Sequence, residues 1–132
     1  MKRVLIIEDE KPLRDAFAFL LESEGFSVTQ AENGKIGLEK LKSIQPHIVL
    51  LDVLMPVMNG LEFLRRARLA KRYPEVKTLM LSNLSDPVSP EDAHAYGVTE
   101  LLLKADLSPS ELAAVVKKLA ASCDETKNEE AA

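Results

Sequence analysis

The sequence contains little of what several classes of protein require. Its 132 residues include one cysteine, no tryptophan and two tyrosines. The single thiol, Cys123, excludes an intrachain disulfide, which suits a reducing compartment. No apolar run is as long as a membrane span, and Met-Lys-Arg-Val leads directly into a predicted strand without a signal peptide. We therefore expect a cytoplasmic protein that makes no membrane contact.

An excess of basic charge is also lacking, since the formal net charge is −4 at pH 7. This balance disfavours non-specific nucleic-acid binding, although a local basic patch is compatible with it. One segment after Gly60 is rich in basic residues: Arg65, Arg66, Arg68, Lys71 and Arg72. We interpret it as a solvated helix face, with a role in binding a partner as the alternative, and we expect no direct DNA binding.

The chain has enough apolar residues, 46% of the total, to bury the core of one domain. Apolar runs predict five strands, at 4–7, 26–29, 48–53, 76–81 and 98–103. Segments with helical apolar spacing follow each strand, and the last begins with the capping box Ser108-Pro109-Ser110-Glu111. Five alternating strands and helices predict an α/β fold with a doubly wound, five-stranded parallel sheet. We assign the domain to residues 1–121 and expect 122–132 to be a disordered, polar, acidic tail.

The third predicted strand carries a carboxylate at its end. In the segment His47–Gly60, four apolar residues precede Asp52, and Pro56, Asn59 and Gly60 predict a loop soon after it. An aspartate inside such a buried strand would be costly unless it lay at the carboxyl end, where open α/β sheets place their sites. We therefore expect Asp52 to be presented at a strand tip.

Other polar residues follow the neighbouring strands. Glu8 and Asp9 end the first strand, Ser82 the fourth and Lys104 the fifth. Because the carboxyl ends of parallel strands share one edge of a sheet, these side chains should lie close to Asp52. Three carboxylates repel one another unless a cation intervenes, and an oxygen-only cluster suits Mg²⁺. Neither histidine lies at a tip, which disfavours a zinc or copper site.

Together these groups match the needs of phosphoryl transfer to an aspartate. The carboxylate attacks, while the cation and the lysine offset charge on the phosphoryl oxygens and the hydroxyl donates a hydrogen bond. Each residue by itself is a weak signal, because strand ends often carry turn-forming or capping residues. Their occurrence on the correct tips of one sheet is a strong one.

The sequence resembles the receiver domains of two-component response regulators, in the stand-alone, chemotaxis-type form. The resemblance covers residue 2 to about residue 121 and rests on the Glu8-Asp9 pair, Asp52 with Met55-Pro56 and Gly60, Ser82 and Lys104. It implies a flavodoxin-like sheet of order 2-1-3-4-5 with five helices. It also implies that Asp52 accepts a phosphoryl group and ligates Mg²⁺ together with Asp9 and the backbone carbonyl of Leu54. Glu8 would act through a bound water, Ser82 as the switch hydroxyl and Lys104 as the partner of the phosphoryl group.

Four positions depart from the family pattern. Glu8 replaces a commoner aspartate, and we expect its extra methylene to move the carboxylate outward without abolishing Mg²⁺ binding. Asn83 stands where a small residue is usual and is expected to crowd the phosphoryl pocket. Leu101 replaces a switching aromatic residue and should stay inward, and Ala105 replaces a proline that follows a cis peptide. The last two positions put the family's usual output mechanism in question.

The resemblance implies a phosphorelay switch that takes a phosphoryl group from a sensor histidine kinase or a histidine phosphotransfer protein. It would catalyse only its own Mg²⁺-dependent phosphorylation and dephosphorylation, and would signal through an unknown downstream protein. The alternative is a pseudo-receiver, a binding module that works without phosphorylation. A Mg²⁺-dependent phosphatase is disfavoured because such enzymes need an aspartate two residues after the nucleophile, where this chain has Leu54.

Overall fold

The computed structural model describes residues 2–53, 55, 57–83, 88–104 and 107–131, and from residue 123 onward only the backbone. Five strands are present: β1 (Arg3–Ile7), β2 (Ser27–Ala31), β3 (Ile48–Asp52), β4 (Lys77–Ser82) and β5 (Glu100–Leu103). The described helices are α1 (Lys11–Ser23), α2 (Gly34–Ile44), α3 (Gly60–Ala67), α4 (Leu69–Arg72), α5 (Pro90–Ala95) and α6 (Pro109–Ala131). The strands form one sheet of order β2-β1-β3-β4-β5, and every neighbouring pair is parallel. The predicted flavodoxin-like order 2-1-3-4-5 is confirmed.

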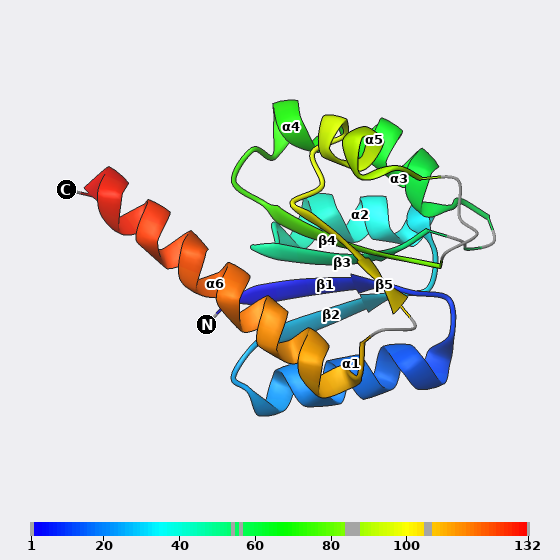
Figure 1. Cartoon of the computed structure of the whole chain (residues 1–132), viewed down its shortest axis with the longest axis horizontal. Helices are drawn as coiled ribbons and strands as arrows, with labels where there is room; N and C mark the ends of the chain where they lie inside the picture. Colours follow the sequence, from blue (N-terminus) through cyan, green and yellow to red (C-terminus); the bar gives the residue numbers. More distant parts are fainter. Residues whose placement is uncertain (1, 54, 56, 84–87, 105–106, 132) are drawn as a thin grey trace.

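Helices cover both faces of the sheet (Figure 1). Alternate residues of β1 divide between the two faces, since Val4 and Ile6 belong to one buried cluster and Leu5 and Ile7 to the other. The first cluster includes side chains of α1 and α6, and the second includes side chains of α3 and α5. All five residues of β3 are buried, as expected for a central strand of a doubly wound sheet.

The third predicted helix is divided in two by Arg68. This residue has φ 52° and ψ 51°, the left-handed conformation that ends α3, and α4 begins at the next residue. The two short helices together occupy the position of the one predicted helix. Phe63, Leu64 and Ala67 are buried, as the apolar spacing predicts.

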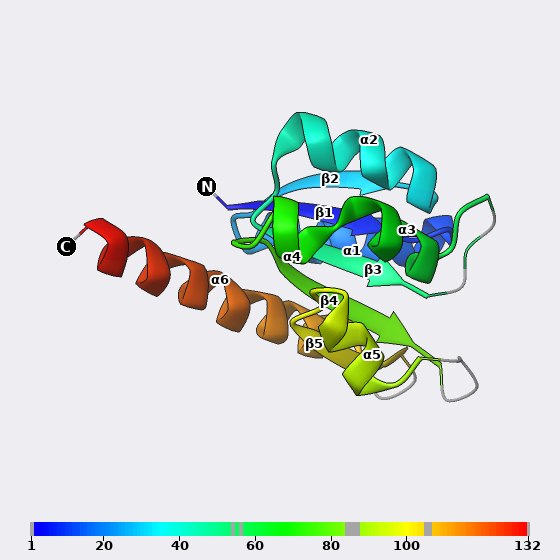
Figure 2. The same ribbon diagram turned by 90° about the horizontal axis from the view of Figure 1, so that it is seen from above.

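The final helix differs from the prediction at its end. The sequence predicted a disordered tail at 122–132, whereas α6 continues to Ala131 and projects beyond the sheet (Figure 2). Residues 110–131 contain no glycine or proline, and alanine, glutamate and lysine are frequent among them. Adding residues of good helix propensity to an existing helix costs far less than starting a new one, so the helix continues without an apolar stripe.

Among the described residues, no helix has both the length and the apolar character that crossing a bilayer requires.

Candidate functional site

Asp52 is the last residue of β3, the strand between β1 and β4. It pairs with Leu81 of β4, and the next residue continues the ladder because the Val53 N–H donates to the Leu81 carbonyl at 3.3 Å. Only 4% of Asp52 is exposed. The central position in the sheet therefore places one carboxylate at the carboxyl edge and removes most of it from water.

The loop after Asp52 is closed by a glycine. The Gly60 N–H donates to the Val53 carbonyl at 2.8 Å, and a Cβ at residue 60 would lie 2.3 Å from the Asp52 carbonyl oxygen. No side chain fits at residue 60 without moving the end of β3. Asn59 caps α3 by accepting a hydrogen bond from the Glu62 N–H at 2.9 Å.

Glu8 and Asp9 follow β1 and differ sharply in exposure. Glu8 is 2% exposed, whereas Asp9 is exposed to solvent. The Glu8 N–H extends the pairing of β1 with β2 by donating to the Ala31 carbonyl, and its Oε2 accepts from the Glu10 N–H at 3.2 Å. The expectation that the longer side chain carries the Glu8 carboxylate outward is therefore wrong. The Glu8 carboxylate is instead buried beside the Lys104 ammonium.

Lys104, directly after β5, joins the two buried carboxylates. Its Nζ lies 2.9 Å from Glu8 Oε1 and 3.3 Å from Asp52 Oδ2. The Lys104 side chain is only 17% exposed. The sequence predicted that these three residues meet at one edge of the sheet. It did not predict the Glu8–Lys104 ion pair, because that pair depends on the rotamer of a flexible glutamate side chain.

Three carboxylates at this edge can provide oxygen ligands for a cation. Glu8, Asp9 and Asp52 each provide an oxygen, and these atoms lie within 4.8 Å of one another. Glu8 Oε1 is buried and accepts no hydrogen bond of acceptable geometry, although the Lys104 ammonium lies near it. A hard, oxygen-only donor set with one exposed member that leaves room for water fits Mg²⁺.

The same burial disfavours the charged form of the two inner carboxylates. Burial raises the pKa of Glu8 to about 7, and the Asp52 charge adds to the rise, while the Lys104 ammonium acts against it. Burial also raises the pKa of Asp52, again opposed mainly by Lys104. For Lys104, burial acts to lower the pKa, but the Glu8 and Asp52 carboxylates outweigh it and raise the pKa. Burial, opposed by Lys104, therefore makes both inner carboxylates harder to ionise than exposed ones.

Ser82 ends β4 and is 4% exposed. Its strand lies beside β3, so the predicted hydroxyl is at the same edge as Asp52. Leu101 is half-buried and packs against the second buried cluster. Leu54 and Ala105, the predicted carbonyl ligand and the residue in place of proline, lie outside the described residues.

A family model described as the response regulator receiver domain matches residues 4–117. The chain belongs to this family of receiver domains. The acidic residues Glu8, Asp9 and Asp52 and the lysine Lys104, which are among the residues that carry the resemblance in the sequence, lie together at the carboxyl edge.

Two relatives from bacteria are transcriptional regulators. The receiver domain is 35% identical over 107 residues to the uncharacterized transcriptional regulatory protein YesN of Bacillus subtilis, covering 79% of this chain and 28% of that one. It is 28% identical over 116 residues to the phosphate regulon transcriptional regulatory protein PhoB of Escherichia coli, covering 88% and 50%. The chain thus spans half or less of the length of these relatives.

Solved structures of similar length share the fold. The chemotaxis protein CheY4 of Vibrio cholerae matches with a TM-score of 0.79 and 28% identity, over 90% of this chain and 98% of that one. A CheY-like receiver domain protein of Methanospirillum hungatei matches with a TM-score of 0.79 and 27% identity, over 98% of each chain. The receiver domain therefore has the flavodoxin-like fold over nearly its whole length.

Proposed function

We propose that this receiver domain is a phosphorylation switch in which Asp52 accepts a phosphoryl group from the phosphohistidine of a sensor histidine kinase or a histidine phosphotransfer protein. The convergence of Asp52 with Glu8, Asp9 and Lys104 at one strand edge supports this proposal. A second candidate, a pseudo-receiver that binds partners without phosphorylation, has only the departures at Leu101 and Ala105 in its favour.

In the proposed transfer, an Oδ atom of Asp52 attacks the phosphorus of the donor phosphohistidine. The new O–P bond forms as the P–N bond breaks, and the imidazole leaves with the electron pair and takes up a proton. Attack by water on the phosphorus later breaks the O–P bond, which regenerates the Asp52 carboxylate and releases inorganic phosphate. The domain would thus catalyse only its own phosphorylation and dephosphorylation.

The surrounding residues have distinct proposed roles. Lys104 is already 3.3 Å from Asp52 Oδ2, so its ammonium can pair with a phosphoryl oxygen once Asp52 is modified. Ser82 would donate a hydrogen bond from its hydroxyl to another phosphoryl oxygen. Glu8, Asp9 and Asp52, with the Leu54 backbone carbonyl, would hold Mg²⁺, which when bound offsets negative charge on the transferring group. Output would pass to a downstream protein through protein–protein contacts.

The proposal is tested by incubating the full chain with acetyl phosphate and Mg²⁺ and measuring intact mass. We expect one acid-labile phosphoryl group, mapped to Asp52 by peptide analysis. Asp52→Asn should take up none, and Asp15→Asn, which changes an exposed carboxylate on α1, should be labelled like wild type. Labelling that persists in Asp52→Asn at Asp9 or Ser82 would refute the assignment.

A metal titration tests the cluster independently of phosphorylation. Mg²⁺ binds only the folded site, so the melting temperature should rise with millimolar Mg²⁺, with a gain of about 1.4 kcal/mol at ten times the Kd. Asp9→Asn and Asp52→Asn should weaken this response. A wild-type melting temperature that ignores Mg²⁺ would show that the three carboxylates are not a metal site.

A further inference from the structure

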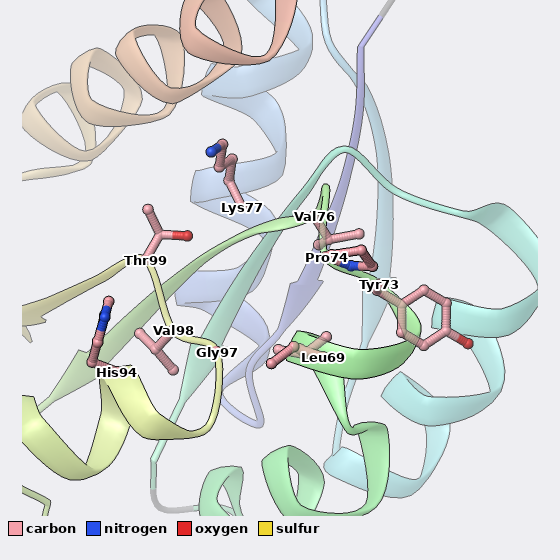
Figure 3. A pocket seen from close by; sticks show the side chains of 10 residues that line it. Leu69, Tyr73, Pro74, Val76, Lys77, His94, Gly97, Val98 and Thr99 are labelled. Atoms are coloured by element: carbon pink, nitrogen blue, oxygen red, sulfur yellow. The ribbon is translucent and has the colours of Figure 1, made fainter. Parts of the chain in front are cut away.

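A pocket of about 340 Å³ opens at the amino edge of the sheet, away from the phosphoryl-acceptor site. Its walls are α4, the end of α5 with the turn after it, the start of β4 and the residues just before β5 (Figure 3). This volume lies in the range that small-molecule sites occupy. No function proposed above uses this edge of the domain.

The pocket is held open by a close contact between two of its walls. Gly97 has φ +93°, and a Cβ there would lie 3.1 Å from both Leu69 Cβ and the Ala70 nitrogen. The turn is fixed by hydrogen bonds from the Gly97 N–H to the His94 carbonyl and from the Val98 N–H to the Ala93 carbonyl, each 3.0 Å. The walls are therefore preformed, and a ligand would bear little cost of ordering them.

The two sides of the pocket differ in polarity. Leu69, Pro74 and Val76 form one side, and Lys77, His94 and Thr99 line the other, with Val98 beside His94 and Thr99 (Figure 3). Leu69 and Val98 are buried members of the second core cluster, so the apolar part is a fixed surface. A ligand that fills the pocket therefore needs an apolar body and a polar end.

The polar side consists of groups that can donate hydrogen bonds. Thr99 is held to Thr78 twice, since its N–H donates to the Thr78 carbonyl at 2.8 Å and its Oγ1 accepts from the Thr78 N–H at 3.0 Å. The hydroxyl proton of Thr99 has no acceptor within the described part of the chain. Lys77 adds a positive charge, and no aspartate or glutamate lines the pocket. The ligand end should therefore be an acceptor with negative charge.

We propose that this pocket binds a small anion with an apolar body, such as an aryl-alkyl carboxylate. The apolar body lies against Leu69 and Val76, and the carboxylate accepts from Thr99 Oγ1 and from the ammonium of Lys77, whose flexible stem can reach it. This binding is independent of phosphorylation at the opposite edge.

Three probes of the same shape and different charge test the proposal: 3-phenylpropionate, 3-phenylpropionamide and 3-phenylpropylamine. Titration of the full chain by methyl and amide NMR should show saturable shifts of Leu69, Val76, Val98 and Thr99 with the carboxylate. The neutral amide should bind about fivefold more weakly, because an exposed ion pair contributes roughly that factor. The amine should bind more weakly than the amide, because the Lys77 ammonium repels its charge.

Two substitutions locate the site, each with its fold checked from the amide spectrum. Lys77→Met keeps an apolar stem but removes the charge. It should therefore lower the affinity for the carboxylate probe to that of the amide probe. Lys71→Met, an exposed position outside the pocket, should leave the affinity unchanged. Ala70→Leu places a larger side chain at the exposed rim and should abolish binding of the carboxylate.

Equal affinity for carboxylate and amine would overturn the charge assignment. Shifts that never saturate, that fall outside the pocket, or that persist unchanged in Ala70→Leu would overturn the site itself.

Discussion

Glu8 is a buried carboxyl group whose pKa of about 7 makes the stability of the domain depend on pH. Between its ordinary value of 4.5 and about 7, the folded state holds a proton that the unfolded chain releases. The free energy of unfolding should therefore fall as pH rises through this window and level off above it, by up to ~3 kcal/mol from Glu8. The raised pKa of Asp52 acts in the same direction. Urea denaturation in EDTA at intervals between pH 4.5 and 8 measures the loss.

The matched variant for this pH dependence is Glu8→Gln, which keeps the size of the side chain and cannot titrate. Its stability should change much less over the same range. Glu39→Gln, at an exposed position on α2, should follow the wild type. If Glu8→Gln lost as much stability as the wild type, the pH dependence would have to come from other groups.

At the level of single residues, the sequence predicted which side chains meet at one edge of the sheet because the reasoning needed only strand ends. Asp52, Ser82 and Lys104 terminate β3, β4 and β5 or follow directly, so parallel pairing brings them to one edge whatever their rotamers. The direction of the Glu8 side chain could not be predicted in this way. It depends on the Lys104 ammonium and the Glu10 N–H, which compete with water for the same carboxylate.

Among the connections between elements, the β3–α3 loop allows the least change. Gly60→Ala would place a Cβ against the Asp52 carbonyl. The Cβ is fixed to the backbone of α3 and the carbonyl belongs to the backbone of β3, so neither can move away easily. We expect a loss of stability of about 1–3 kcal/mol, as for other overpacked sites, together with slower phosphorylation of Asp52. Urea denaturation and the acetyl phosphate assay measure the two effects.

Gly37→Ala is the control for Gly60→Ala, since both glycines lie in helices. A Cβ at residue 37 would meet Ile7 Cδ1 at 2.6 Å, the end of a side chain that can rotate. Gly37→Ala should therefore cost less stability and leave phosphorylation unchanged. Equal effects of the two substitutions would show that the contact with the Asp52 carbonyl has no special role.

Strand β5 carries the departure from the family that bears on signalling. Leu101 pairs with Met80 and packs against the second core cluster. Full burial of a leucine contributes about 1.5–3 kcal/mol, and the half-buried Leu101 gains part of this. We expect a beryllium fluoride complex, which mimics the phosphoryl group, to shift amide signals of 82–90 and 103–107 and to leave the Leu101 methyls unchanged. NMR spectra with and without the mimic test this. A Leu101 side chain that changes rotamer while residues 82–90 stay still would contradict it.

The elements themselves were largely predictable, because apolar periodicity and capping residues act locally. Asn33, Asn59, Ser89 and Ser108 each accept a hydrogen bond at the start of a helix, through chemistry visible in the sequence. The break at Arg68 was not predictable from its residue type, since arginine is a good helix former. There, tertiary packing of Ala67 and Leu69 into the core outweighs the cost of a left-handed arginine.

For the molecule as a whole, the packed core described by the structure ends before the last residue of α6. Among the side chains that the structure describes, which end at residue 122, the buried ones of this helix run from Leu112 to Ala120. A chain truncated after residue 121 should therefore keep its free energy of unfolding within about 0.5 kcal/mol and its phosphorylation rate, while its helical circular dichroism signal falls. A loss of more than 1 kcal/mol would show that 122–132 belongs to the folded domain.

The excess of carboxylates over ammonium groups at the strand tips has a consequence for reaction rates. Every phosphoryl donor is itself an anion, so each would approach a site of like charge once these carboxylates are ionised, whatever the shape of the protein that carries it. A divalent cation bound by these carboxylates would lower this barrier for all donors alike. Cation concentration should therefore set how fast the domain is phosphorylated, and the ratio of rates between two donors of equal charge should stay constant as that concentration changes.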